Sequence, residues 1–158
     1  MNVNKRVLSL SALLRKLKTV RRGKKLVITN GCFDLIHAGH LKVLARARRH
    51  GDILIVGLNG DASVRRLKGP KRPILALKDR GSLMAALRLV DYVTYFNEDT
   101  PQKLIARLRP DVLVKGGDWT AGKIVGRELV RKVVRVPFLK GRSTTGIIEA
   151  ISQRYGKA

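Results

Sequence analysis

Hydrophobic positions follow two different spacings along this chain. Between positions 8 and 20, leucines and valines recur every three or four residues, which predicts an amphipathic helix. Ser9 or Ser11 could cap this helix, and Gly23 would end it. Short apolar runs then alternate with further helical segments, and each run is typical of a buried strand. The expected strands are 25–29, 52–58, 92–96, 112–115 and 133–136, and the later helices are 40–50, 61–67, 77–89, 101–108 and 144–155.

The alternation of strands with helices predicts the fold class. Parallel strands need helical crossovers, and these crossovers place helices on both faces of the sheet. We therefore expect an α/β protein with a Rossmann-like, doubly wound parallel sheet in three α/β/α layers. A chain of 158 residues fits a single domain, 1–158, with an N-terminal helix in 1–23 and an α/β core in 24–158. In such sheets ligands bind beyond the carboxyl ends of the strands, so the loops there are where chemistry is expected.

Composition narrows the class of protein. The hydrophobic content of 44% is enough for a buried core, while no apolar run approaches the roughly 20 residues that span a bilayer. The first residues show no secretory signal, so we expect a cytoplasmic protein with no membrane partner. Cys32 is the only cysteine, which excludes an internal disulfide and a cysteine-based zinc site.

The charge of the chain suggests an anionic ligand. Thirty-four Lys and Arg residues against eleven Asp and Glu residues give a formal net charge of +23, which attracts polyanions. This positive charge would attract nucleotides and sugar phosphates, and it would also attract nucleic acid. The basic residues are dispersed, however, and the three Phe, three Tyr and one Trp do not interleave with them as base-stacking platforms would. We therefore do not expect nucleic acid to be the partner.

The loop after the first expected strand contains His37, Gly39 and His40. Histidines three residues apart lie on one side of a helical first turn, and the glycine between them lets a large group approach the backbone. A helix N-terminus also favours an anion. The pair could instead be two metal ligands, which usually need a third, or two ordinary polar residues at a helix start.

Hydroxyl residues open the last expected helix at Ser143, Thr144 and Thr145. Their commonest use at such a position is to cap the helix. Backbone N–H groups and hydroxyls at a helix start also form a cradle for an anion. The two roles are compatible.

Two further groups of charged residues follow expected strands. Lys115 and Asp118 flank two glycines, with Trp119 next, a pattern that permits close approach of a ligand but is also found in simple turns. A second group consists of the basic residues Lys68, Lys71, Arg72 and Arg80. Each of them alone is typical of a solvated surface charge, but together they could close over a triphosphate.

The histidine loop resembles the signature of the cytidylyltransferase-like nucleotidyltransferase superfamily, whose members carry a Gly-x-Phe-Asp-x-x-His-x-Gly-His stretch. The resemblance implies that His37 and His40 contact the nucleotide phosphates and stabilise the charge that builds on the α-phosphate. Transfer of this kind depends mostly on positioning and electrostatic stabilisation. The matching positions are Gly31, Phe33, Asp34, His37, Gly39 and His40.

The resemblance also implies roles for other residues. Arg80 and Lys115 are expected to be catalytic residues together with the two histidines. Asp34 is expected to organise the loop after the first strand. ATP is the expected nucleotide substrate and Mg²⁺ the expected cofactor, with no metal ligand assigned to the protein. The expected nucleotide-binding residues are Asn30, Gly31, Cys32, Phe33, Asp34, Gly39, Lys68, Arg142, Ser143, Thr144 and Thr145.

Within the superfamily, the chain most resembles the adenylyltransferases that make ADP-heptose from D-glycero-D-manno-heptose 1-phosphate. Glycerol-3-phosphate cytidylyltransferases are the nearest rival, although that group tends to carry arginine where this chain has Phe138. A nucleic-acid-binding module on the same frame is the alternative from another class. The segments that carry the closer resemblance are 29–34, 66–69, 72–73, 90–91, 98–101, 113–118, 124–126 and 142–145.

The resemblance further implies partners. We expect a sugar phosphate and a nucleotide as ligands, a separate sugar kinase and phosphatase in the pathway, and a homodimer. The segment 128–133 lacks the Gly-Gly that relatives carry before the last strand, which affects the shape of that loop. The resemblance does not explain the high positive charge.

Overall fold

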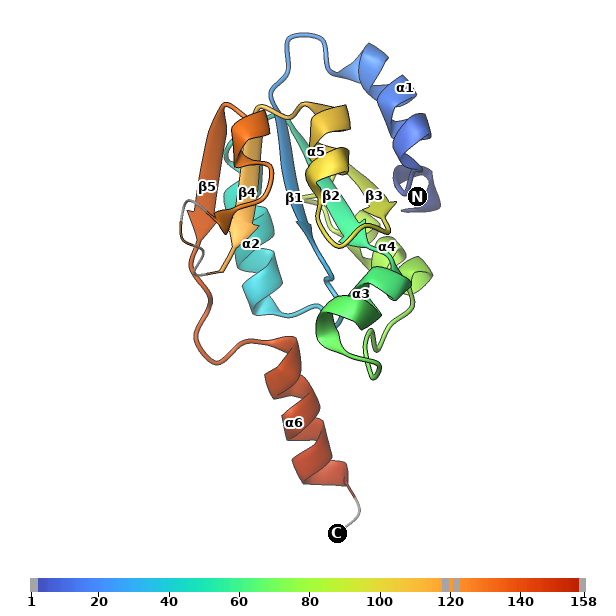
Figure 1. Cartoon of the computed structure of the whole chain (residues 1–158), viewed down its shortest axis with the longest axis vertical. Helices are drawn as coiled ribbons and strands as arrows, with labels where there is room; N and C mark the ends of the chain where they lie inside the picture. Colours follow the sequence, from blue (N-terminus) through green and yellow to red (C-terminus); the bar gives the residue numbers. More distant parts are fainter. Residues whose placement is uncertain (1–2, 118–119, 121–122, 157–158) are drawn as a thin grey trace.

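The structure is a computed structural model that describes residues 3–117, 120 and 123–156. Within these residues, five strands form one parallel sheet in the order β3-β2-β1-β4-β5 (Figure 1). The strands are β1 (Leu26–Gly31), β2 (Ile53–Asn59), β3 (Tyr92–Phe96), β4 (Val112–Gly116) and β5 (Lys132–Val136). The helices are η1 (Val3–Arg6), α1 (Leu10–Val20), α2 (Ala38–Arg48), α3 (Asp61–Lys68), α4 (Leu77–Ala86), α5 (Gln102–Leu108), η3 (Arg127–Leu129) and α6 (Thr144–Tyr155).

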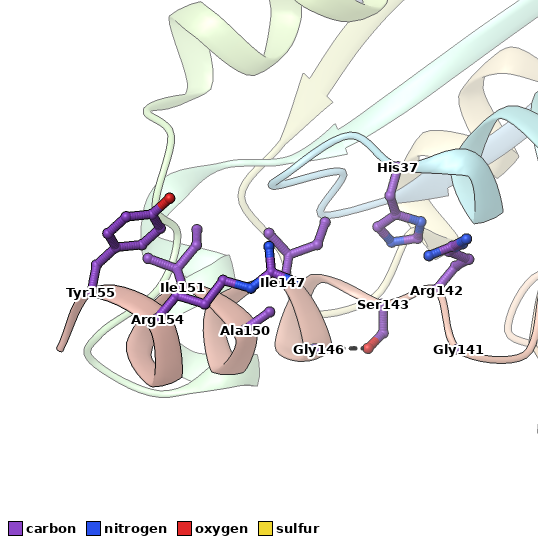
Figure 2. A pocket seen from close by; sticks show the side chains of 10 residues that line it. All are labelled: His37, Gly141, Arg142, Ser143, Gly146, Ile147, Ala150, Ile151, Arg154 and Tyr155. Carbon is purple, nitrogen blue, oxygen red and sulfur yellow. Dashed lines mark hydrogen bonds between the residues drawn. The ribbon is translucent and has the colours of Figure 1, made fainter.

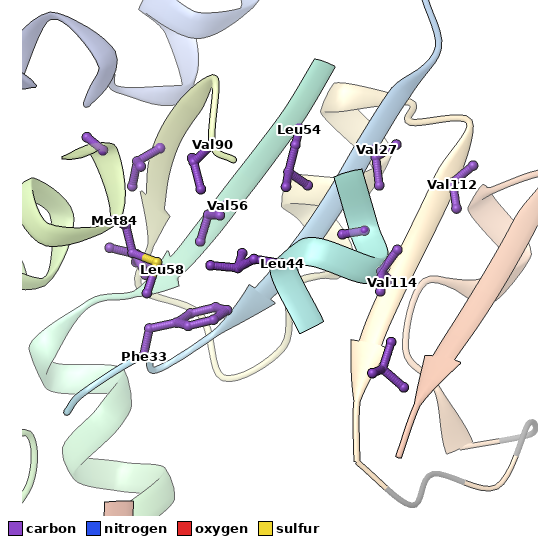
Figure 3. Packing of buried hydrophobic residues seen from close by; sticks show 14 of the residues in the cluster. Val27, Phe33, Leu44, Leu54, Val56, Leu58, Met84, Val90, Val112 and Val114 are labelled. Atoms are coloured by element: carbon purple, nitrogen blue, oxygen red, sulfur yellow. The ribbon is translucent and has the colours of Figure 1, made fainter. Parts of the chain in front are cut away.

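Each face of the sheet has its own hydrophobic core, because successive strand residues point to opposite faces. Leu54 of β2 belongs to a cluster with Leu44 of α2 and Met84 of α4 (Figure 3). The next residue, Ile55, belongs to a second cluster with residues of α1 and α5. Leu54 and Ile55 are both 0% exposed, so the sheet is covered on both sides. This arrangement confirms the expected doubly wound α/β/α fold.

The strand order reverses at β1, the central strand. The chain runs outward from β1 through β2 to β3 and then returns to the other side of β1 with β4 and β5. The loops after β1 and β4 therefore leave the sheet at its topological switch point, where ligands bind in folds of this type. These loops carry His37 and Lys115, so the fold brings two of the expected site segments to one edge.

Most element boundaries agree with the expectation from sequence to within two residues. The helix expected from position 40 begins earlier, at Ala38, because His37 serves as its N-cap. Helix α4 ends at Ala86 rather than at position 89, because Leu87 has an extended backbone with ψ 128°. A short helix at Val3–Arg6 was not expected from sequence.

That N-terminal segment is fixed by pairing with a distant strand. Val7 forms an isolated parallel bridge with Val93 of β3, and the Leu8 N–H donates to the Val93 carbonyl at 2.9 Å. The segment thereby covers the outer edge of β3. Only the folded chain brings these residues together, so local periodicity could not predict the pairing.

Helix α6 has the expected bounds but an unexpected position. It projects from the body of the molecule at the carboxyl edge of the sheet (Figure 1), and none of its residues is buried. Its attachment is the segment that follows β5. Among the described helices, none is long and apolar enough to cross a membrane.

Candidate active site

The two histidines of the loop after β1 stack on one another at the start of α2. Their ring centroids lie 3.8 Å apart, and their planes differ by 22°. The Nδ1 atom of His37 accepts a hydrogen bond from the Gly39 N–H at 3.1 Å. Because an accepting Nδ1 carries no proton, the neutral ring of His37 has its N–H on Nε2. His37 therefore has a donor available for a ligand at Nε2.

His40 is held in its neutral form. Burial and then the neighbouring His37 lower the pKa of His40 to about 4, against the opposing effect of the Asp34 carboxylate. Burial also lowers the pKa of His37. The Nδ1 atom of His40 is buried and has no hydrogen-bond partner among the described residues. Buried polar atoms normally have a partner, so this atom is a natural contact for a bound ligand or water.

Gly39 lets the starts of α2 and α6 lie close together. A Cβ atom on Gly39 would lie 2.9 Å from the His37 ring and 3.4 Å from the backbone oxygen of Arg142. A contact of 2.9 Å is shorter than real Cβ atoms show, so any side chain at this position would displace His37. The glycine is needed for the fold of the histidine loop itself. The same geometry shows that the histidine loop and the hydroxyl-rich loop face one another.

A cavity of 340 Å³ lies between His37 and α6 (Figure 2). Ser143 is the N-cap of α6, and its hydroxyl accepts a hydrogen bond from the Gly146 N–H at 3.0 Å. The lining residues are His37, Gly141, Arg142, Ser143, Gly146, Ile147, Ala150, Ile151, Arg154 and Tyr155. The expected residues Thr144 and Thr145 occupy the first turn of α6 but are not among the lining residues.

Asp34 ties the loop after β1 to the segment that leads into α4. Its carboxylate accepts hydrogen bonds from the backbone N–H groups of Ile74 and Leu75, each at 2.9 Å, and forms an ion pair with Arg72 at 2.6 Å. Burial raises the pKa of Asp34, but these donated hydrogen bonds and the Arg72 charge hold it below its usual value. Asp34 is 1% exposed and is not among the residues that line the cavity. Its contacts join the loop after β1 to the entry of α4, and its role in organising the loop stays a prediction.

Arg80 lies inside the protein. Its guanidinium is 0% exposed and donates to the carbonyl oxygens of Cys32, Asn59 and Leu75 and to the carboxylate of Asp61. These bonds join the loop after β1 to the loop after β2. We therefore interpret Arg80 as a positioning residue in this arrangement, and the expected contact with substrate stays a prediction.

Lys115 and Asn30 join the ends of neighbouring strands. The Lys115 ammonium donates to the Asn30 side-chain oxygen at 3.0 Å, which links β4 to β1. Burial lowers the pKa of Lys115 to about 8. The group is therefore mostly charged at neutral pH and lies at the same edge as the histidines. Asp118 and Trp119, which the sequence placed beside it, lie outside the described residues.

The loop between β1 and His37 is tightly packed. Phe33 is 5% exposed and has a φ of 45°, a left-handed conformation that is uncommon for residues other than glycine. Its ring packs against His40, with centroids 5.0 Å apart. A Cβ atom on Gly31 would already touch the Phe33 ring at 3.4 Å.

Basic side chains act electrostatically on this same loop. Burial raises the pKa of the Cys32 thiol, and the charges of Lys68, Arg80 and Arg72 oppose that rise. Lys68 itself is exposed at the end of α3, whereas Arg72 is held by Asp34. Of the basic residues expected to close over a triphosphate, Lys68, Arg72 and Arg80 lie near the loop after β1. Lys71 is exposed and is not among the residues that line the cavity.

Sequence reasoning missed the contribution of the α6 side chains. Ile147, Ile151 and Tyr155 recur every four residues and line the cavity on one face of the helix (Figure 2). This spacing is visible in the sequence, where it predicts a helix but does not indicate a cavity wall. It also missed Asp61, whose carboxylate accepts from Arg80 at 2.7 Å and from the Leu77 N–H at 3.2 Å.

The assembled site is suited to a polyphosphate. It combines neutral imidazole donors, two helix N-termini and the cations Lys115 and Arg142, all of which favour oxyanions. Among the described residues, no group of three or more His, Cys, Asp and Glu side chains could hold a metal ion. The described site residues supply hydrogen-bond donors and positive charge.

Comparison with known proteins gives matches over most of the chain. Residues 28–152 match the family model described as "Cytidylyltransferase-like". A protein named "Bifunctional protein HldE" from Trichlorobacter lovleyi is 58% identical over 138 residues, which cover 85% of this chain and 28% of that protein. One of the same name from Geobacter sulfurreducens is 56% identical over 140 residues, covering 86% and 29% respectively. The chain thus spans less than a third of the length of these curated relatives.

Solved structures share the fold. A lipopolysaccharide core biosynthesis protein from Thermoplasma volcanium matches with a TM-score of 0.64 and 29% identity, over 75% of this chain and all of that one. A pantoate-beta-alanine ligase from Francisella tularensis, solved with an ATP analogue and beta-alanine, matches with a TM-score of 0.62. Its sequence is 12% identical over 88% of this chain and 68% of the ligase, which shows similarity of fold alone.

Proposed function

This chain belongs to the cytidylyltransferase-like family, and on that premise we propose that it is an adenylyltransferase. It would transfer AMP from ATP to D-glycero-D-manno-heptose 1-phosphate, giving ADP-heptose and pyrophosphate. The observation that carries the proposal is the approach of two helix starts to one cavity. A Cβ atom added to Gly39, at the start of α2, would lie 3.4 Å from the backbone oxygen of Arg142, beside the start of α6. His37 and Ser143 line the same cavity.

The reaction needs little covalent work from the protein. An oxygen of the sugar 1-phosphate attacks the α-phosphorus of ATP, forming a new P–O bond, while the bond from the α-phosphorus to the oxygen bridging to the β-phosphate breaks. Pyrophosphate leaves with that bonding pair. The attacking phosphate is already ionised at neutral pH, so the site requires no strong general base. It must hold the two anions together and stabilise the charge on the α-phosphate.

The residues of the site divide this work. His37 and His40 would donate N–H groups to the α-phosphate, and the start of α6 at Ser143 would hold the β- and γ-phosphates. Lys115 and Arg142 would add positive charge without taking up protons. Mg²⁺ usually binds through nucleotide phosphates and water, and when bound it would neutralise part of the triphosphate charge.

The heptose substrate is supported by the relatives. The proteins named HldE are 53–58% identical over more than four fifths of this chain. The Thermoplasma protein is named for lipopolysaccharide core biosynthesis. A sugar kinase and a phosphatase would supply the heptose 1-phosphate and are part of this proposal.

A substrate panel tests the proposal. The purified protein would be incubated with ATP, CTP or GTP together with heptose 1-phosphate or glycerol 3-phosphate, and pyrophosphate release would be measured. We expect release to be fastest with ATP and heptose 1-phosphate. Preference for CTP with glycerol 3-phosphate would replace the heptose assignment with a glycerol-3-phosphate cytidylyltransferase. No release with any pair would overturn the assignment as an enzyme of this class.

A further inference from the structure

A second hollow lies between α2 and the edge strand β5, away from the proposed active site. Its volume is 560 Å³. The cavity at His37 adjoins the first turn of α2, whereas the second hollow adjoins its last turn. Helix α2 has 11 residues, so the two sites are separated by about 16 Å along its axis. The lining residues are Arg46, His50, Gly117, Lys132, Val133, Val134, Arg135 and Pro137.

Basic side chains dominate this hollow, and none of its lining residues is acidic. Arg46 and His50 come from α2 and the residue pair that follows it, and Lys132 and Arg135 come from β5. We call these four residues the basic groove. Sequence inspection treated them as dispersed, because the two halves are about 80 residues apart in the chain. The packing of α2 beside β5 brings them together.

The helix side of the groove is regular. Lys42, Arg46 and His50 recur every four residues and therefore lie on one face of the helical segment. They extend over about 12 Å, at 1.5 Å per residue. The Lys42 ammonium donates to the Pro137 carbonyl at 3.1 Å, which places this face against the segment that follows β5. Arg46 therefore adds positive charge to the helix side of the groove, and Lys42 adds a second cation one turn away.

This arrangement works against folding stability. Like charges four residues apart on a helix repel one another, and the charges of Lys132 and Arg46 reach the same imidazole. Burial, then Lys132 and then Arg46 lower the pKa of His50. The Nε2 atom of His50 is buried and has no hydrogen-bond partner in the described part of the chain. Arg46 and Lys132 form no ion pair within the described part of the chain, and a buried polar atom beside these two cations indicates that an anion completes the groove.

Protection of the sheet edge explains only part of the pattern. Lysine on an edge strand prevents pairing with other chains, and Lys132 would serve that purpose by itself. It does not account for Arg46 and Lys42, which lie on the helix. The extra cations need another explanation, and a bound polyanion supplies one.

We propose that the basic groove binds the phosphodiester backbone of nucleic acid, without sequence preference. The groove is open and long enough to contact successive phosphates of one strand, and it carries no aromatic side chain with which to stack bases. A membrane surface is less suitable, because Val134 is buried and the groove lacks the exposed apolar face of interfacial helices. This binding would accompany the proposed catalysis and does not depend on it.

The test is a binding titration with a fluorescent DNA duplex of about 20 base pairs. Arg46→Ala combined with Lys132→Ala should weaken binding about tenfold and reduce the slope of log affinity against log salt by about 2, one for each lost phosphate contact. The matched control is Arg15→Ala combined with Lys18→Ala. These exposed residues of α1 lie on the opposite face of the sheet, and their loss changes the net charge equally. The control should change affinity by no more than about twofold.

Three outcomes would overturn the proposal. One is an equal loss in both double variants, which would assign binding to overall charge. Another is no binding of the duplex by the unaltered protein. The third is tighter binding to vesicles rich in phosphatidylglycerol than to the duplex, which would assign the groove to a membrane surface.

A second measurement does not depend on variants. The His50 imidazole resonance would be followed by NMR in the unaltered protein as the duplex is added. Nearby phosphates should raise the pKa of His50 and shift its resonance, while the resonance of His37 stays in place. An unchanged His50 resonance under saturating duplex would also overturn the proposal.

Unaltered pyrophosphate release in both double variants would show that the fold is intact.

Discussion

At the scale of single residues, the site depends on imidazoles that remain neutral. His37 caps α2 with one ring nitrogen, and His40 stacks beneath it in a buried position. Neutral rings cost less to bury than charged ones and still donate N–H groups. In the proposed reaction they would stabilise charge that appears only as the α-phosphate reacts. Stacking also holds the two rings against one another.

We predict that His40→Ala folds normally but lowers turnover by about 100-fold or more, as the loss of a preorganised donor should. Pyrophosphate release measures turnover, and circular dichroism checks the fold. His50→Ala is the matched control, since His50 lies at the other end of α2, and its turnover should be unchanged. Normal turnover in the His40 variant would contradict the assigned role.

Acid should destabilise the folded protein through His40. The pKa of this residue is about 4 in the folded state, against 6.5 ordinarily, so between these values the unfolded chain binds a proton that the folded chain does not. The stability provided by the neutral ring is fully present above pH 6.5 and is lost as the pH falls through 4. Urea midpoints at about pH 7 and about pH 5 should differ more in the unaltered protein than in His40→Gln. Equal differences would assign the acid sensitivity to other groups.

At the scale of elements, the site is held by ties between loops. Asp34 connects the loop after β1 to the entry of α4, and Arg80 connects the same loop to the end of β2. These ties are buried, so their hydrogen bonds compete little with water. They explain how a loop with a left-handed phenylalanine keeps one conformation.

We predict that Asp34→Asn lowers the free energy of unfolding by roughly 2–3 kcal/mol, because it removes the charge from a buried and multiply bonded acceptor. Asp99→Asn is the matched control. Asp99 pairs with Arg66 at the surface, where both side chains are about half exposed, so its loss should cost no more than about 0.5 kcal/mol. Urea unfolding measures both values. Similar losses in the two variants would contradict a special role for Asp34.

Helix α6 combines a structural cap with a proposed phosphate contact, and one substitution separates them. Aspartate caps helices about as well as serine does, so Ser143→Asp should preserve the helix. Its negative charge would oppose the triphosphate and should raise the KM for ATP about tenfold or more. Circular dichroism and steady-state kinetics measure the two effects. An unchanged KM would show that Ser143 serves only as a cap.

At the scale of the whole molecule, carboxylates are used mainly to hold the fold. Asp91 accepts from the Leu54 N–H at the start of β2, and Asp111 accepts from the Leu26 N–H at the start of β1. Each also pairs with an arginine, Arg48 and Arg21 respectively. Even with all eleven acidic residues counted against the 34 Lys and Arg residues, the formal net charge is +23. The surplus is free to act on anionic ligands at long range.

The position of α6 leads to a prediction about the molecule as a whole. Because none of its residues is buried, ending the chain after Lys140 should change the free energy of unfolding by less than about 1 kcal/mol. The same truncation removes one wall of the cavity and should abolish pyrophosphate release. Urea unfolding and the release assay test both parts. A large loss of stability would show that α6 packs on the core.

The sequence by itself determined the layered fold and indicated where the proposed site lies. Burial follows local periodicity, so alternating apolar runs and helical spacings were enough to predict the parallel sheet, and β3 and α6 have the expected bounds. The resemblance at His37 and His40 indicated which loop carries the chemistry. These features depend on neighbours in the chain, which a sequence displays directly.

The tertiary structure alone decided what each side chain contacts. Arg80, which the resemblance assigned to phosphate, is buried among carbonyl oxygens, and its contact with substrate stays a prediction. Arg46 and Lys132 are far apart in the chain but line the same hollow. The shifted pKa values of His40 and Lys115 likewise come from burial by distant segments. Desolvation and charge interaction depend on distance through space, and only the folded chain fixes those distances.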